Sequence, residues 1–245
     1  MYSLSALAKL KGWQLDFYVD HLSQTIIDQP KGNYLGALEN GANIIALSDK
    51  LEGQSVQEYV ENTILPQYPN ALYVPEGGRF QQAAVGVNRL ADEITQWANQ
   101  NNIKQLKVVL PSGTGTTALF LQKHFLDIGC DVNVLTCACV GGDEYLKKQF
   151  FELCPDKNVH PKILKTQKKY HFGKLYNEFY ALWQELKQET SIEFDLLYDP
   201  LGWKTLLHYL DETQECSGQF PIMYIHQGGL LGNETMLPRY KRKYK

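Results

Sequence analysis

A loop rich in glycine and hydroxyl groups stands where a predicted strand meets a predicted helix, and it carries the clearest chemical signal in the sequence. Its residues are Ser112, Gly113, Thr114, Gly115, Thr116 and Thr117. Free backbone N–H groups and the positive dipole end at the start of a helix attract an anion, and glycine lets the backbone approach it closely. A helix cap would need only one hydroxyl group, whereas this loop has four hydroxyl residues and two glycines. The loop therefore predicts a phosphate site.

Three kinds of phosphate site can be compared with this loop. A P-loop needs a lysine directly after its second glycine, and no lysine occurs between Lys107 and Lys123. Gly113, Gly115 and Ala118 match a dinucleotide fingerprint, but the stretch LTCACVGG at the end of the next predicted strand lacks the acidic residue that holds the ribose. An NAD-binding, Rossmann-like protein remains an alternative. A phosphate monoester needs many donors and no acidic partner, so the loop favours a phosphorylated cofactor or substrate.

Polar or glycine-rich turns follow other predicted strands. The residues concerned are Glu76, Gly77, Gly78, Asp199, His226, Gly228 and Gly229. Because ligands of parallel α/β proteins collect at the carboxyl ends of the strands, we expect Glu76, Asp199 and His226 to share one cleft with the phosphate loop. The alternative for each is structural, since a glycine pair usually forms only a turn and a single histidine is as often structural as catalytic.

Helices and strands alternate along the chain, which is typical of α/β proteins with parallel sheets. Strand patterns occupy Trp13–Val19, Asn43–Leu47, Ala71–Val74, Gln105–Leu110, Asp131–Cys139, Phe194–Tyr198 and Phe220–Ile225. Helical patterns occupy Tyr2–Lys11, Asn33–Asn40, Val56–Leu65, Phe80–Gln100, Ala118–Leu126, Glu144–Leu153, Lys174–Gln188 and Trp203–Leu210. The centre of Gln105–Leu110 is apolar without alternation, so we expect a strand covered on both faces.

Composition and charge place the chain among ordinary globular proteins. Of its 245 residues, 44% are apolar and 21% are charged. No stretch approaches the roughly 18 to 20 apolar residues of a membrane span, and no secretory signal is seen, so a cytoplasmic location is expected. Residues 239–245, RYKRKYK, carry five positive charges, which leaves 19 basic and 27 acidic residues elsewhere. The acidic body disfavours specific nucleic-acid binding, and the basic tail is expected to be solvated.

The cysteines form neither a disulfide framework nor a metal motif. They are odd in number and irregularly spaced: Cys130, Cys137, Cys139, Cys154 and Cys216. We expect them to be reduced. Cys137 and Cys139 share one face of a predicted strand, but two thiols without further ligands make a poor zinc site, so core packing is expected and no metal is assigned.

Four segments together carry a family resemblance: ALYVPEGG, VVLPSGTGTTA, LLYDPLGW and YIHQGGLLGN. In this order and spacing they resemble the pyridoxal-phosphate enzymes of the 1-aminocyclopropane-1-carboxylate deaminase and D-cysteine desulfhydrase family, over almost all of the chain. The resemblance implies a tryptophan-synthase-β-like fold (fold type II), with parallel sheets in three αβα layers. It also implies a small domain over residues 1–78 and a larger cofactor-binding domain over residues 79–245, which ends in the basic tail.

The same resemblance implies pyridoxal phosphate as the cofactor, with its phosphate held by Ser112–Thr117. The implied reaction is that of a hydrolase or lyase of amino-acid metabolism, which converts a small amino acid to a keto acid and ammonia. A homodimer is among the expectations. The alternative of another class is a non-catalytic protein that binds phosphate or cofactor.

The sequence departs from the family pattern in two places. The family's Schiff-base lysine, in a Gly-Asn-Lys motif, and its Ser-Asn-His stretch are absent, so the chain is expected to lack an N-terminal segment, to have no assigned catalytic residue and to be inactive as given. The family deaminases have a Tyr-Glu pair after Asp-Pro, where this chain has Leu201, Gly202 and Trp203. Lys204 is the only lysine close behind a pocket motif, and we do not expect it to act as a substitute.

Overall fold

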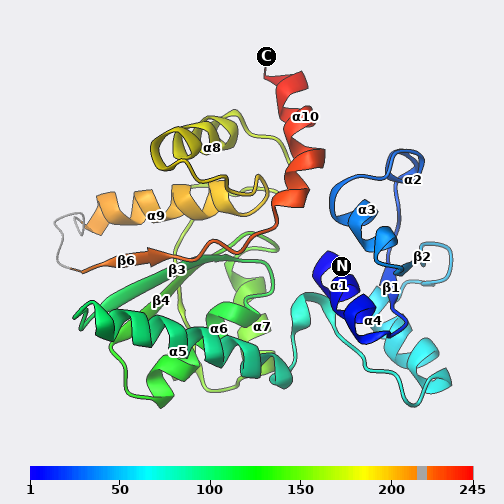
Figure 1. Ribbon diagram of the computed structural model, residues 1–245, viewed down its shortest axis with the longest axis horizontal. Coiled ribbons are helices and arrows are strands. Elements are labelled where there is room, and N and C mark those ends of the chain that lie inside the picture. Colours follow the sequence, from blue (N-terminus) through cyan, green and yellow to red (C-terminus); the bar gives the residue numbers. More distant parts are fainter. Residues whose placement is uncertain (214–219, 245) are drawn as a thin grey trace. The chain divides into compact units, whose positions relative to one another are not determined.

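The structure, a computed structural model, describes residues 1–213 and 220–244 (Figure 1). Contacts divide the chain into two units. The first holds Met1–Tyr73 and Leu231–Arg242, and the second holds the described part of Val74–Leu230 together with Lys243 and Tyr244. The sequence-based division at residue 78 did not anticipate that residues 231–242 return to the first unit.

The first unit is a small α/β unit with a parallel pair of strands. Strand β1 (Asp16–Val19) pairs with β2 (Asn43–Ala46), and Phe17 lies opposite Ile44. The helices are α1 (Tyr2–Lys11), α2 (Gln24–Asp28), α3 (Gly32–Glu39), α4 (Val56–Tyr59) and, except for its last residue, α10 (Asn233–Lys243). Both strands and α1, α3 and α4 lie where the sequence pattern predicts strands and helices.

The second unit has three layers around a parallel sheet of strand order β5-β4-β3-β6. The strands are β3 (Leu106–Ser112), β4 (Val132–Ala138), β5 (Lys162–Ile163) and β6 (Ile222–Tyr224). The helices are α5 (Ala84–Gln100), α6 (Thr116–Asp127), α7 (Asp143–Leu153), α8 (Asn177–Thr190) and α9 (Asp199–Thr213). Helices α5 and α6 cover one face of the sheet and α9 covers the other, with α8 packed on α9 (Figure 1). The αβα arrangement expected from the sequence is confirmed.

Strand β3 is buried on both faces, which explains its unbroken apolar sequence. Val108 and Leu110 belong to the core with α5 and α6, whereas Val109 packs with Leu206 of α9. All three are at most 2% exposed. Because β3 lies between β4 and β6, its carboxyl end is flanked by two other strand ends.

Two predicted strands are wrong. Residues Ala71–Val74 form no strand, and Leu72 is exposed; Pro69 and Pro75 on either side lack the N–H donors that a ladder requires. Residues Phe194–Tyr198 also form no strand, because the Asp195 carboxylate accepts hydrogen bonds from the backbone N–H groups of Leu197 and Tyr198. Such local bonds replace the ladder that a strand would make.

The basic C-terminal residues are not an extended solvated tail. Residues 239–243 continue α10, in which Asn233, Met236 and Tyr240 form a buried stripe at helical spacing while the basic side chains are exposed. Lys245 lies outside the described residues. In the described part of the chain, no helix is both long enough and apolar enough to cross a bilayer.

The cysteines of the described residues are free thiols. Cys137 and Cys139 are buried, Cys130 and Cys154 are partly buried, and Cys216 lies outside the described residues. Over residues 1–213 and 220–244, no three His, Cys, Asp or Glu side chains gather as a metal site would require.

A pair of buried carboxyl groups starts helix α9. Asp195 Oδ2 accepts a hydrogen bond from the backbone N–H of Asp199, and Asp199 Oδ2 accepts one from the backbone N–H of Asp195, at 3.2 and 3.0 Å. Asp199 Oδ1 also accepts a hydrogen bond from the Tyr224 hydroxyl at 2.8 Å. Asp199 is 1% exposed. Burial, with the charge of Asp195 as the second cause, raises the pKa of Asp199 to about 7.

This raised pKa predicts a pH-dependent stability. Between about pH 4, where an unfolded aspartate titrates, and about pH 7, the folded state retains a proton that the unfolded chain has lost, so stability falls as the pH rises and levels off above that range. Asp199→Asn should remove this slope, on the order of 2 kcal/mol between pH 5 and pH 7.

The measurement is the free energy of unfolding of each variant at several pH values. The pH slope of the unfolding free energy is compared rather than its absolute value. The amide introduced by Asp199→Asn also places an N–H group near the Asp195 N–H, which lowers stability by the same amount at every pH. Asp211→Asn, at an exposed position of the same helix, should keep the wild-type slope. An Asp199→Asn variant with the wild-type slope would contradict the assignment.

Candidate functional site

The phosphate loop, Ser112–Thr117, connects the end of β3 to the start of α6. Gly115 has a φ of 77°, in the left-handed region, and a Cβ there would lie 2.6 Å from Leu146 Cδ1 and would overlap the Phe150 ring, both on α7. Only glycine fits this position. Gly113 is different, because a Cβ there would lie 3.5 Å from the Tyr198 ring, an ordinary contact.

The loop presents a run of unbonded backbone donors. Among the described residues, no partner is found for the backbone N–H groups of Gly113–Thr117, and the first bonded amide of the helix is that of Leu119, which donates to the Gly115 carbonyl at 2.9 Å. These donors stand at the positive end of the α6 dipole. The arrangement can therefore bind an anion through the backbone.

The hydroxyl groups of the loop are not all available. Thr136 Oγ1 donates to the Leu110 carbonyl at 2.8 Å, so the 2.6 Å bond between Ser112 Oγ and Thr136 Oγ1 must use the Ser112 proton. Ser112 thus donates inside the sheet and is 4% exposed. Thr114 and Thr116 share a hydrogen bond of 3.2 Å, and Thr117 is partly exposed. The bond between Thr114 and Thr116 uses the proton of one of these two threonines, so the other one and Thr117 remain as hydroxyl donors of the loop.

The predicted turn at Glu76, Gly77 and Gly78 lies against this loop. Gly77 has a φ of 70°, and a Cβ at this position would overlap the Thr114 side chain. The Glu76 side chain is exposed. The structure therefore brings this turn to the phosphate loop, and the close approach is what requires glycine.

Tyr198 connects the loop to the start of α9. Its ring lies against Gly113 and, on the other side, 5.0 Å from the Phe172 ring between centroids. Burial raises the pKa of Tyr198 to about 12, and the charges of Cys139, Asp195 and Glu76 add to the effect. The phenol therefore stays protonated in the neutral pH range and can donate a hydrogen bond. The next residue, Asp199, is buried in the carboxyl pair and does not offer its side chain to a ligand.

Both ring nitrogens of His226 make hydrogen bonds within the protein. Its Nδ1 accepts a hydrogen bond from the Gly228 N–H at 2.9 Å, so its proton is on Nε2, which donates to the Glu193 carbonyl at 2.8 Å. The ring stacks on Phe194 with centroids 5.1 Å apart. A Cβ at Gly229 would lie 3.8 Å from Asp195 Cβ. The site role expected for His226, Gly228 and Gly229 stays a prediction.

Sequence reasoning missed several neighbours of the loop. The Gln227 side chain donates to the Pro111 carbonyl at 2.8 Å, and the Cys139 N–H donates to the Ser112 carbonyl at 2.9 Å. These two bonds hold the end of β3 from either side. A hydrogen bond with Cys137, together with burial, raises the pKa of Cys139 well above its usual range, so this thiol stays protonated. No local pattern marks either residue, because each acts through an element distant in sequence.

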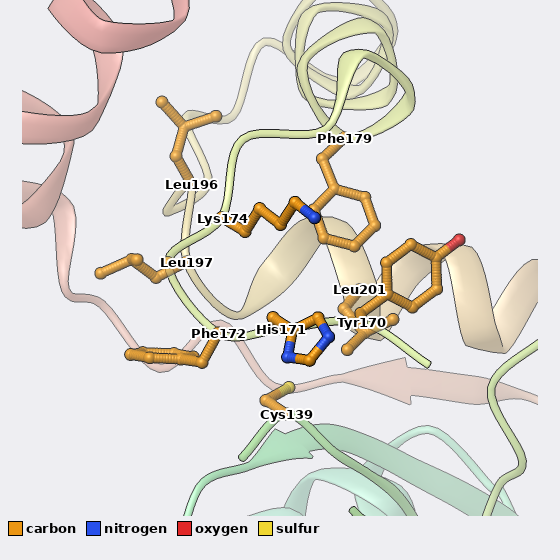
Figure 2. A pocket seen from close by; sticks show the side chains of 10 residues that line it. Cys139, Tyr170, His171, Phe172, Lys174, Phe179, Leu196, Leu197 and Leu201 are labelled. Atoms are coloured by element: carbon orange, nitrogen blue, oxygen red, sulfur yellow. The ribbon is translucent and has the colours of Figure 1, made fainter. Parts of the chain in front are cut away.

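A hollow opens beside Cys139 (Figure 2). It is lined by Cys139, Tyr170, His171, Phe172, Gly173, Lys174, Phe179, Leu196, Leu197 and Leu201. Lys204 lies elsewhere, because its Nζ pairs with Glu178 Oε2 at 3.1 Å. The hollow and the phosphate loop are neighbours: Cys139 lines the hollow and donates its N–H to the Ser112 carbonyl, and the Tyr198 ring contacts both Gly113 and the lining residue Phe172.

Comparison with known proteins finds similar chains both by sequence and by structure. No model of a protein family matches the chain. The chain is 24% identical over 193 residues to the putative D-cysteine desulfhydrase 2, mitochondrial, of Oryza sativa subsp. japonica, a match that covers 71% of this chain and 46% of that protein. The chain thus spans less than half of the length of that relative.

The fold is similar to the crystal structure of an ACC deaminase homologue. The TM-score is 0.71 at 21% identity, and the match covers 97% of this chain and 74% of that chain. The parallel α/β architecture agrees with fold type II. The two matches confirm what the sequence motifs indicate: the chain resembles the 1-aminocyclopropane-1-carboxylate deaminase and D-cysteine desulfhydrase family.

Proposed function

We propose that this chain forms the part of a pyridoxal-phosphate-dependent deaminase or lyase that binds the cofactor phosphate, with the phosphate held by Ser112–Thr117. The observation that carries this proposal is the run of backbone N–H groups at Gly113–Thr117 without partners among the described residues. A phosphate monoester can accept several such bonds at once, and the start of α6 favours its charge.

The surroundings of the loop suit this cofactor better than a dinucleotide. The residues that follow β4, Cys139 and Val140, offer no carboxylate to a ribose, which an NAD site would require. The protonated phenol of Tyr198 can donate a hydrogen bond next to Gly113. When bound, pyridoxal phosphate supplies an electron-withdrawing ring that stabilises negative charge on an amino acid.

The substrate class follows from the relatives. One of them is named a D-cysteine desulfhydrase and the other an ACC deaminase homologue. We therefore assign a small amino acid as the substrate, with a keto acid and ammonia as the products. A cytoplasmic location and a homodimer belong to the same proposal.

One observation favours a second candidate, a protein that binds phosphate or cofactor without catalysis. Lys204, the lysine close behind the Asp199-Pro200 motif, pairs with Glu178 Oε2 at 3.1 Å. A cofactor held only by its phosphate lacks a covalent anchor and an amine that can move the substrate proton.

Gly113→Asp should weaken the binding of pyridoxal phosphate, measured by titration at low ionic strength. The new carboxylate repels the phosphate, and affinity should fall about tenfold or more. Gly113→Ala is the matched control, because a methyl group fits beside Tyr198, and it should bind as the wild type does. Gly115→Asp is less informative because its Cβ overlaps α7. Equal affinity of Gly113→Asp and Gly113→Ala would refute the phosphate assignment.

The purified 245-residue chain should hold pyridoxal phosphate only reversibly. After incubation and dialysis we expect no visible absorbance and no release of ammonia from D-cysteine or 1-aminocyclopropane-1-carboxylate. Borohydride followed by peptide mapping should find no lysine labelled stoichiometrically. A single stoichiometric label together with steady ammonia release would instead make this chain an enzyme in its own right, and Lys204→Ala would be the first variant to examine.

A further inference from the structure

The hollow beside Cys139 is built from several segments of the second unit. It is lined by residues 170–174 between β5 and α8, by Phe179 of α8, by Leu196, Leu197 and Leu201 around the start of α9, and by Cys139, which follows β4. Figure 2 shows the Lys174 and His171 side chains between Leu196 and Leu197 on one side and Tyr170 on the other, above Cys139. The hollow thus combines apolar walls with two nitrogen-bearing side chains.

The charge of Lys174 has no carboxylate partner in the described structure. Its Nζ lies 5.7 Å from the centre of the Tyr176 ring. The nearby acid Glu178 is already engaged by Lys168 at 2.8 Å and by Lys204 at 3.1 Å. Asp195, next to the lining residue Leu196, accepts hydrogen bonds from the backbone N–H groups of residues 197 to 199. Lys174 has an exposed side chain, and its ammonium group makes no ion pair with any described residue.

The segment that carries Lys174 is held in place. The Lys174 N–H donates to the His171 carbonyl at 3.1 Å. The carbonyl of Leu175 accepts hydrogen bonds from Tyr244 Oη at 2.9 Å and from Lys243 Nζ at 3.3 Å. Fixing the backbone on both sides of Lys174 lowers the entropy cost of using its side chain for binding.

We propose that this hollow binds a carboxylate group of a small molecule, with Lys174 as its cation and His171 as a further donor. The assignment of that carboxylate to the side chain of the amino-acid substrate rests on the proposed function, since the hollow adjoins the phosphate loop through Cys139 and Tyr198. The substrate would then be an amino acid with an acidic side chain.

The test compares aspartate with asparagine, each in the D and L forms, by calorimetric titration of the full chain without added cofactor. The two ligands differ only in side-chain charge, so their difference isolates the second carboxylate. We expect aspartate to bind about tenfold more tightly than asparagine, because it gains one charge-assisted hydrogen bond. Lys174→Gln should remove this preference. Lys169→Gln, at an exposed neighbouring lysine, should keep it.

Two outcomes would overturn the inference. One is an aspartate preference that Lys174→Gln leaves intact or that Lys169→Gln reduces equally. The other is loss of aspartate binding in Gly113→Asp but not in Lys174→Gln, which would place the anion on the phosphate loop. Failure of the proposed function is distinguishable, because it shows as unchanged affinity for pyridoxal phosphate in Gly113→Asp, whatever the aspartate result.

Discussion

The burial of β3 on both faces is the constraint on which the rest of the second unit depends. Val108 and Leu110 fix one helical layer, Val109 fixes the other, and the sheet partners β4 and β6 pair along both edges of the strand. The backbone that leaves this strand at Ser112 therefore starts from a defined position. Since Cys139 and Gln227 bond to its last two carbonyls, the loop Ser112–Thr117 begins from a point held on both sides.

Polar groups near this loop divide into two kinds. The side chains of Ser112, Asp199 and His226 make hydrogen bonds within the protein. These bonds orient β3, α9 and the turn after β6. The backbone amides of Gly113–Thr117 and the exposed Lys174 ammonium make no hydrogen bond or ion pair among the described residues. This division separates the groups that hold the structure together from those that stay available to a ligand.

Much of the fold and the location of the loop could be predicted from sequence, because hydrophobic periodicity and glycine chemistry are local signals. The absence of a strand at Phe194–Tyr198 could not be predicted, because the β-type composition of this segment is overridden by hydrogen bonds from the Leu197 and Tyr198 amides to the Asp195 carboxylate. The hydrogen-bonding roles of Asp199 and His226 could not be predicted from sequence either. Each depends on a partner from a distant segment, Tyr224 and Glu193 respectively, and no spacing rule reveals such pairs.

The left-handed backbone of Gly115 packs directly against core side chains of α7. The space for a side chain at this position is already filled by Leu146 and Phe150. Position 115 and these two core positions therefore cannot vary independently during evolution. A larger residue in the loop would require a smaller residue on α7 at the same time, and the strain of a positive φ would remain. The sequence of the loop is in this way coupled to the packing of helix α7.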